Sequence, residues 1–143
     1  MNHQDDLRAA VQFYESLTID SVSRVDDIYT NDAWFKDPFN EVRGIAAISK
    51  IFTHMFAQVK DPKFVVTTSM VDGGAAFLTW EFHFRMKRFS PAPQCIRGAT
   101  HLRFAPSGKI EFHRDYWDAA EELYEKIPAL GSLMRTLKRL ARG

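Results

Sequence analysis

The chain of 143 residues is 45% hydrophobic, and its 19 Lys and Arg residues nearly balance its 18 Asp and Glu residues. This length suits one domain with a substantial core, and the hydrophobic content excludes an intrinsically disordered protein. The near-neutral charge argues against a dedicated nucleic-acid-binding protein, which carries a basic excess. The single cysteine, Cys95, cannot form an internal disulfide. Because no signal-peptide pattern opens the sequence and no run of about 18 apolar residues occurs, we expect a cytoplasmic protein.

Three segments in the first half of the chain show the apolar periodicity of helices. Residues 5–19, 21–30 and 45–59 place apolar side chains three or four positions apart, which is the spacing of one helical face. Between the second and third segments, residues 33–37 are predicted to form a short strand that Pro38 ends.

The second half of the chain changes to the alternating pattern of strands. The predicted strands cover residues 63–72, 75–88, 94–105 and 109–117. Asp72-Gly73-Gly74 and Pro106-Ser107-Gly108 supply turn residues between neighbouring strands. Two further helices are predicted over residues 118–127 and 129–141, divided at Pro128. Helices followed by a run of strands indicate the α+β class, with one curved antiparallel sheet and helices on its concave side.

Three short motifs resemble those of a known superfamily. They are VQFYESL at 11–17, WFKDPFNEVRGIAAI at 34–48 and HLRFAPSGKIEF at 101–112. Together with the order of elements, they make residues 8–118 similar to the nuclear-transport-factor-2-like superfamily, which includes ketosteroid isomerases and SnoaL-like polyketide cyclases. The resemblance implies a single domain over residues 1–143, with a cone-shaped, cystatin-like core over about 5–118 and a C-terminal helical tail over 119–143. It also implies an apolar pocket and a homodimer formed through the outer face of the sheet.

The second motif places the carboxylate of Asp37 among aromatic rings and before a proline. In the ketosteroid isomerases the carboxylate at this position is the general base that moves a proton next to a ketone, so the resemblance implies this role for Asp37. Trp34, Phe35 and Phe39 could keep the site poorly hydrated, which strengthens a carboxylate as a base. Alternatively, Asp37 caps the third helix or accepts hydrogen bonds from loop amides.

Two further positions correspond to the oxyanion-stabilising groups of the isomerases. Tyr14 matches the tyrosine that donates a hydrogen bond to the developing enolate oxygen, although a core tyrosine would fit the same helical face. Thr100 matches the position of a protonated aspartate that the isomerases use as a neutral acid. A threonine hydroxyl is a weaker donor than a carboxylic acid, so the sequence departs from the steroid isomerases here.

The last predicted strand carries His113, Asp115 and Trp117 at alternate positions. SnoaL-like cyclases use an aspartate as acid and base in an intramolecular aldol closure, so the resemblance implies this role for Asp115, with His113 as its partner. The preceding hairpin loop decides whether these side chains face the pocket. A three-residue loop over 106–108 turns them outward, whereas a four-residue loop brings Thr100 beside His113. We follow the second register, which the resemblance implies.

The resemblance also implies which side chains contact a substrate. They are Phe35, Phe52, Phe56, Trp80, Thr100 and Trp117. His83 and His101 lie on the opposite, polar face of their strands, toward solvent or a partner subunit. The five histidines show no His-x-x-x-His spacing, and the lone cysteine excludes Cys-x-x-Cys. We therefore expect neither a metal site nor a cofactor.

The sequence supports two hypotheses about function. The first is a cofactor-independent enzyme that transfers protons on an apolar carbonyl compound, as an isomerase, cyclase or dehydratase. The second is a non-catalytic module of the same fold that binds a ligand or docks a protein as a dimer. In the tail, a leucine stripe flanked by basic residues suits packing on the domain or on a partner subunit. Contact with an anionic membrane surface is the alternative that we do not favour.

Overall fold

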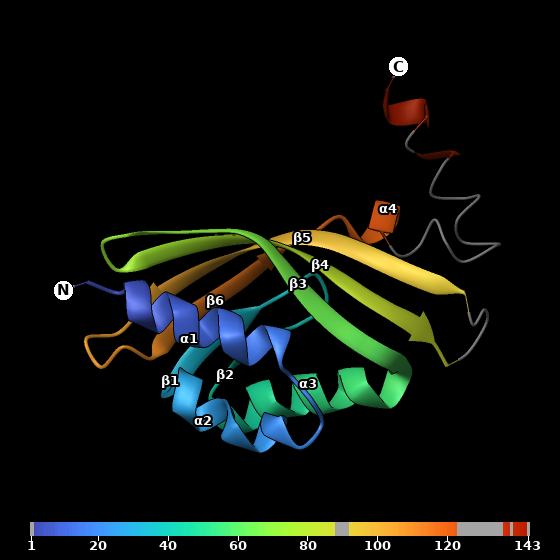
Figure 1. Ribbon diagram of the computed structural model, residues 1–143. Helices are drawn as coiled ribbons and strands as arrows, with labels where there is room; N and C mark the ends of the chain where they lie inside the picture. The colour runs from blue at the N-terminus through green and yellow to red at the C-terminus, as the bar shows by residue number, and fades with distance from the viewer. Residues whose placement is uncertain (1, 88–91, 123–135, 138, 143) are drawn as a thin grey trace.

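The computed structural model describes residues 2–87, 92–122, 136–137 and 139–142. In this part of the chain six strands form one curved sheet, and the N-terminal helices lie on its concave side (Figure 1). The α+β class and the curved sheet around N-terminal helices are therefore confirmed. No helix among these residues is both long and apolar enough to span a membrane.

The helices follow the predicted segments, with one difference. They are α1 (Gln4–Glu15), the 3-10 turn η1 (Ser21–Arg24), α2 (Val25–Ile28), α3 (Ile45–Gln58) and α4 (Ala119–Glu122). The helix predicted over 21–30 is wrong at its C-terminal end, because Tyr29 begins a strand. Only the start of the helix predicted over 118–127 is described, and most of the one predicted over 129–141 lies outside the described residues.

The strands alternate in direction across the sheet, with one exception. They are β1 (Tyr29–Lys36), β2 (Glu41–Arg43), β3 (Val59–Asp72), β4 (Ala75–Met86), β5 (Pro93–Phe104) and β6 (Ile110–Tyr116). Their order is β2-β1-β6-β5-β4-β3, and only the β1–β6 pair among these neighbours is parallel. The sequence analysis predicted β3 to β6 within a few residues but missed β2 and the first half of β1. The parallel pair brings together strands from the two ends of the domain.

The core lies between the concave face of the sheet and the apolar faces of α1 and α3. Its buried side chains include Leu7, Ala10 and Tyr14 from α1, Ile48 and Phe52 from α3, and Leu78, Trp80, Phe82, Phe84 and Leu102 from β4 and β5. Full burial of one such aliphatic or aromatic side chain contributes about 1.5–3 kcal/mol. The alternation of β4 is therefore explained by one face that packs against helices and one that faces outward.

The β5–β6 hairpin contains a β-bulge that decides which side chains face the helices. Next to the loop, Phe104 pairs with Ile110, as a three-residue loop requires. One residue further along β5, Arg103 pairs with Phe112, so Glu111 is the extra residue of β6.

Neither predicted register holds along the whole hairpin. The four-residue loop is wrong, because the Ala105 N–H donates to the Lys109 carbonyl at 2.8 Å across a three-residue loop. The inward direction of His113 and Asp115, which the four-residue loop predicted, is nevertheless confirmed. The bulge produces it, because one extra residue reverses the alternation of β6. Thr100 pairs with Asp115, and both side chains face the concave side together with His113.

Candidate active site

A cavity of about 270 Å³ lies between the concave face of the sheet and the helices α1 and α3. Its walls are mostly aromatic and aliphatic. The polar side chains among its lining residues are Tyr14, Asp37, Asn40, His54, Gln58, Thr100, His113 and Asp115. This volume is near the lower end for small-molecule sites. The cavity therefore suits a small ligand with an apolar body and one or two polar groups.

Every predicted site residue except Phe56 lines this cavity. Trp34, which was predicted to help keep Asp37 poorly hydrated, does not line it and stacks on Phe112 instead. The residues brought together are Tyr14, Phe35, Asp37, Phe52, Trp80, Thr100, His113, Asp115 and Trp117. On α3 the lining face is centred on Met55, and Phe56 is rotated from it by about 100° around the helix axis. The predicted substrate contact of Phe56 is therefore not supported.

Strand β6 places His113 and Asp115 on the cavity wall, two residues apart. His113 is buried, and its Nε2 lies 2.7 Å from Oδ1 of Asp115. Phe35, its partner on β1, stacks on the imidazole at a centroid distance of 4.4 Å and thereby fixes the plane of the ring. The side chain of Asp115 is 18% exposed, so it is the member of the pair that a ligand can reach.

Thr100 holds the same carboxylate oxygen from the neighbouring strand. Its hydroxyl donates to Oδ1 of Asp115 at 2.6 Å and accepts a hydrogen bond from Nε1 of Trp80 at 2.8 Å. The Trp80 ring lies across Gly98, its partner on β5, where a Cβ atom would be only 2.5 Å from the indole. The only O–H group of Thr100 therefore donates to Asp115 and not to a ligand.

The second oxygen of Asp115, Oδ2, is the open position of this group. It makes no hydrogen bond within the described part of the chain, whereas Oδ1 is held by His113 and Thr100. No buried polar side-chain atom among the described residues lacks a partner, so Oδ2 is accessible. It is the oxygen that can accept a proton from a ligand.

Two buried tyrosines lie behind His113. The Tyr14 and Tyr29 hydroxyls are 2.6 Å apart, and the Tyr29 hydroxyl is 2.8 Å from Nδ1 of His113. Burial, reinforced by the negative charge of Asp115, raises the pKa of both phenols far above their ordinary value. Both phenols therefore stay neutral and act as hydrogen-bond donors rather than as bases. Tyr14 lines the cavity, and Tyr29 supports it from behind.

One assignment of hydrogens satisfies the short contacts of this network. Thr100 and the Nε2–H of His113 both donate to Oδ1 of Asp115. Tyr29 donates to Nδ1 of His113, and Tyr14 donates to the Tyr29 oxygen. This assignment uses a neutral imidazole and an ionised carboxylate.

Sequence reasoning missed Tyr29, which it included in a predicted helix. In the structure Tyr29 is the first residue of β1 and has no exposed surface. A fully buried tyrosine needs a hydrogen-bond partner for its hydroxyl. This requirement was the one indication that Tyr29 belongs to a polar network. The partner, His113, lies 84 positions away in the chain, so spacing alone could not identify it.

Asp37 lines the same cavity, but its carboxylate already has several donors. Oδ1 accepts hydrogen bonds from the backbone N–H groups of Phe39 and Asn40 at 2.8 and 2.7 Å. The side-chain amide of Asn40 adds contacts of 3.1 and 3.2 Å to the two oxygens. These are the loop-amide contacts that the sequence analysis gave as the alternative to a base.

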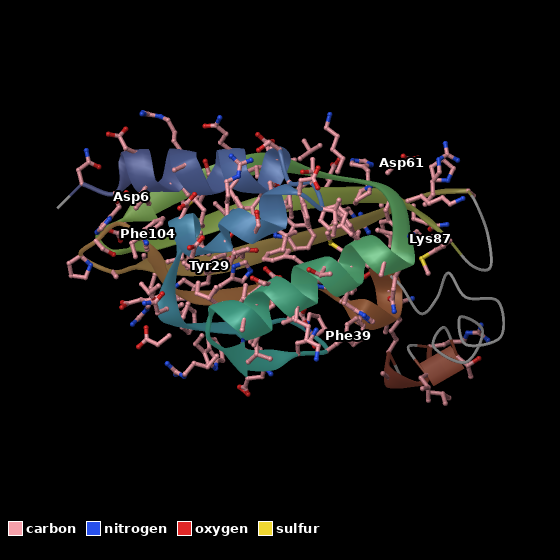
Figure 2. All side chains as sticks on the ribbon, turned by 90° about the horizontal axis from the view of Figure 1, so that it is seen from below. Asp6, Tyr29, Phe39, Asp61, Lys87 and Phe104 are labelled. Carbon is pink, nitrogen blue, oxygen red and sulfur yellow. The ribbon has the colours of Figure 1, made fainter. Side chains whose placement is uncertain are left out.

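The turn that Asp37 closes places an aromatic ring at the edge of the cavity. Phe39, which is labelled in Figure 2, is 52% exposed. It contacts the Trp117 ring edge-to-face at a centroid distance of 5.6 Å. Because both rings also line the cavity, they form an aromatic rim where Asp37 orders the loop.

A sequence model of the SnoaL-like domain family matches residues 10–113. This segment includes Tyr14, Tyr29, Thr100 and His113, and it ends two residues before Asp115. No curated protein matches the chain by sequence.

Solved structures resemble the chain closely in fold and weakly in sequence. A putative SnoaL-like polyketide cyclase from Shewanella putrefaciens has a TM-score of 0.69 at 18% identity, covering 83% of this chain and 96% of that one. A protein with a ketosteroid isomerase-like fold from Catenulispora acidiphila, in complex with trimethylamine, has a TM-score of 0.72 at 15% identity, covering 87% and 93%. An LEH-like epoxide hydrolase from M. tuberculosis has a TM-score of 0.68 at 14% identity, covering 95% and 91%.

At these identities the structural similarity shows the fold alone, and the names of the three proteins refer to different chemistries. The family match extends over most of the chain and includes most of the cavity network. The chain belongs to the SnoaL-like domain family, and it shares the fold of a nuclear-transport-factor-2-like protein of known structure.

Proposed function

We propose that the cavity is an active site for proton transfer on a small, largely apolar carbonyl compound, without a cofactor. Isomerisation, ring closure and dehydration all use this step. The observation that carries the proposal is the state of the Asp115 carboxylate. Its Oδ1 is held by His113 and Thr100, its Oδ2 is accessible, and Asp115 and Tyr14 both line the apolar cavity.

The reaction uses one group as a base and another as a hydrogen-bond donor. Oδ2 of Asp115 removes a proton from the carbon next to the carbonyl, and the electron pair moves onto the carbonyl oxygen. Tyr14 turns its O–H from Tyr29 to that oxygen and stabilises the enolate. In an isomerisation, Asp115 then returns the proton to another carbon. In a ring closure, the enolate carbon first attacks a second carbonyl group of the same molecule, and Asp115 returns the proton to the alkoxide that forms. A positioned acid–base group contributes roughly 10²–10⁴ in rate, and an oxyanion donor roughly 10²–10³.

His113 and Tyr29 position the base and take no proton from the substrate. The Nε2–H of His113 fixes Oδ1 of Asp115, and the Tyr29 hydroxyl on Nδ1 keeps the imidazole in this tautomer. The resemblance implied Asp37 as the base. The donors that surround the Asp37 carboxylate support Asp115 instead.

Solvent deuterium exchange tests the proposal without a known substrate. The protein is incubated in D₂O with a panel of small cyclic and aromatic ketones, and deuterium at the carbon next to the carbonyl is followed by NMR. For a ketone that exchanges, we expect Asp115→Asn to reduce the rate at least ~10²-fold and Tyr14→Phe to reduce it by ~10²–10³-fold. Tyr116→Phe is the control, because Tyr116 is 49% exposed and does not line the cavity. Exchange that persists at the wild-type rate in both cavity variants would rule the mechanism out.

A non-catalytic ligand-binding protein is the second candidate. It is favoured because Thr100 donates a hydrogen bond to Asp115, and Asp37 accepts hydrogen bonds from its own loop. The resemblance implied that both groups contact a substrate, but both form hydrogen bonds within the protein instead. A phenol that saturably quenches the fluorescence of Trp80 and Trp117, with no exchange for any ketone of the panel, would support this candidate.

A further inference from the structure

Three potential metal ligands of different kinds meet on the convex face of the sheet, opposite the cavity. His83 on β4 pairs directly with Cys95 on β5, and Glu81 lies two residues before His83. Ligand atoms of the three side chains all lie within 4.8 Å of one another. Nε2 of His83 is 2.9 Å from Oε1 of Glu81.

The direction of these side chains follows from the alternation of β4. The residues that alternate with Glu81 and His83 are Trp80, Phe82 and Phe84, and all three are buried against the helices. The Glu81 and His83 side chains are instead 42% and 47% exposed. The cluster is therefore open to ions from solvent, on the side of β4 and β5 that faces away from α1 and α3 (Figure 1).

The chemistry of this donor set fits zinc. Imidazole nitrogen, thiolate sulfur and carboxylate oxygen are the ligand types of Zn²⁺ sites, whereas Ca²⁺ and Mg²⁺ prefer oxygen ligands alone. Tetrahedral bonds of about 2.0–2.3 Å place neighbouring ligand atoms roughly 3.3–3.6 Å apart. The ligand atoms already lie within 4.8 Å of one another, and the half-exposed Glu81 and His83 side chains have room to change rotamer toward this spacing.

We propose that Glu81, His83 and Cys95 bind one Zn²⁺ ion, with a water molecule in the fourth position. The directly opposed pair His83 and Cys95 fixes the separation of two ligands, and ligands on strands are held more precisely than ligands on loops. The bound ion connects β4 to β5 near the ends of these strands at Met86 and Pro93.

Three cationic side chains, those of Lys63, Arg85 and Arg97, lie beside the cluster on the same face of the sheet. A thiolate and a carboxylate give the site two negative charges. Arg97, which pairs with Glu81, is turned toward α4, where its guanidinium is 2.7 Å from Glu122 and 3.8 Å from Glu121. Lys63, opposite His83 on β3, is exposed, and its long side chain can extend into solvent.

Cobalt binding tests the site directly. The metal-free full-length chain, kept reduced with a phosphine, is titrated with Co²⁺ and then with Zn²⁺. We expect one equivalent of Co²⁺ per chain, a near-ultraviolet thiolate-to-cobalt charge-transfer band, and loss of that band when Zn²⁺ displaces cobalt. Zn²⁺ should also slow alkylation by iodoacetamide at least tenfold, a measurement made unambiguous because Cys95 is the only cysteine. A thiolate ligand must lose its proton, so affinity should rise with pH.

Matched variants separate this site from adventitious binding. Cys95→Ser should abolish the charge-transfer band, and His83→Gln and Glu81→Gln should each weaken Co²⁺ binding at least tenfold. His101→Gln is the control, because His101 lies on the same face of β5 outside the cluster. Absence of a thiolate band in the wild-type chain, or binding that His83→Gln leaves unchanged, would overturn the proposal. None of these readouts depends on catalysis in the cavity.

Discussion

The two carboxylates of the cavity differ in how their oxygen atoms are used. Oδ1 of Asp37 accepts from two backbone amides and a side-chain amide, which is the pattern of a turn-closing aspartate. Oδ1 of Asp115 accepts from His113 and Thr100, and its Oδ2 stays accessible. One carboxylate therefore orders a loop, and the other, from a residue that lines the cavity, keeps one accessible oxygen. Proximity to aromatic rings does not distinguish these roles, but the hydrogen-bond partners do.

The buried tyrosines predict how stability depends on pH. Tyr14 and Tyr29 have pKa values raised by burial, so they remain protonated in the folded state while the unfolded chain ionises above pH of about 10. Their contribution to stability is present below that pH and is lost as the pH rises further. The free energy of unfolding should fall by about 1.4 kcal/mol per pH unit for each tyrosine.

Absorbance titration and urea unfolding measure this effect. Two of the four tyrosines should fail to ionise in their ordinary range until the protein unfolds. Tyr29→Phe should remove one of these two and make the decline of stability above pH of about 10 less steep. Four tyrosines that titrate together with ordinary pKa values would show that the phenols are not buried as described.

Gly98 provides the space for the indole that supports Thr100. A Cβ atom at this position would lie 2.5 Å from the Trp80 ring, so Gly98→Ala should displace the ring and break its hydrogen bond to Thr100. We expect a loss of about 1–3 kcal/mol in the free energy of unfolding, measured by urea denaturation, and a changed tryptophan emission. Gly74→Ala is the control, because the nearest atom to its Cβ would be 3.8 Å away. Equal stability of the two variants would contradict this account of Trp80.

Among the elements, the β5–β6 hairpin contributes most to the site. A regular hairpin with the observed three-residue loop would turn His113 and Asp115 outward. The single extra residue, Glu111, turns them inward and brings Asp115 opposite Thr100. The bulge is therefore the local feature that brings His113, Asp115 and Thr100 together on the concave face, and bulges are common near functional sites.

At the scale of the whole molecule, the convex face of the sheet carries a row of rings. Trp34 stacks on Phe112 at 4.8 Å, Phe112 contacts His101 at 4.9 Å, and His101 stacks on Phe77 at 4.5 Å. Met70, paired with Phe77, continues the row, and these two side chains are 57% and 48% exposed. Partial burial lowers the pKa of His101, which keeps its ring neutral. An apolar row of this extent on an open face is typical of an interaction surface.

We propose that a second copy of the chain covers this row of rings on the outer face of the sheet, as the resemblance to the superfamily implied. Light scattering coupled to size-exclusion chromatography should give the mass of two chains for the wild type. Phe77→Glu combined with Met70→Glu should give the mass of one chain, because each charge would be buried in the interface without a partner. Ile19→Glu is the control, because Ile19 is 52% exposed and lies outside the sheet. A wild-type monomer would refute the dimer.

The sequence predicted the fold better than the site, for physical reasons. Local periodicity reports which face of a strand or helix is apolar, and it located α1, α3 and the long strands. Tyr29 was assigned to a helix because the apolar residues before it fit the helical spacing of three or four positions as well as a strand pattern. The bulge at Glu111 and the parallel β1–β6 pair depend on contacts between distant segments, which no local pattern contains. The cluster of Glu81, His83 and Cys95 likewise comes from pairing across two strands, so motif spacing did not find it.

The proposed mechanism requires Asp115, and not Asp37, to be the base. The most direct test is the deuterium exchange rate of one responsive ketone in Asp115→Asn and Asp37→Asn, both with unfolding curves to confirm that they are folded. We predict that Asp115→Asn lowers the rate at least ~10²-fold, whereas Asp37→Asn, which keeps an oxygen acceptor for the loop amides, lowers it less than tenfold. A large loss in Asp37→Asn with little change in Asp115→Asn would contradict the claim and return the role of base to Asp37.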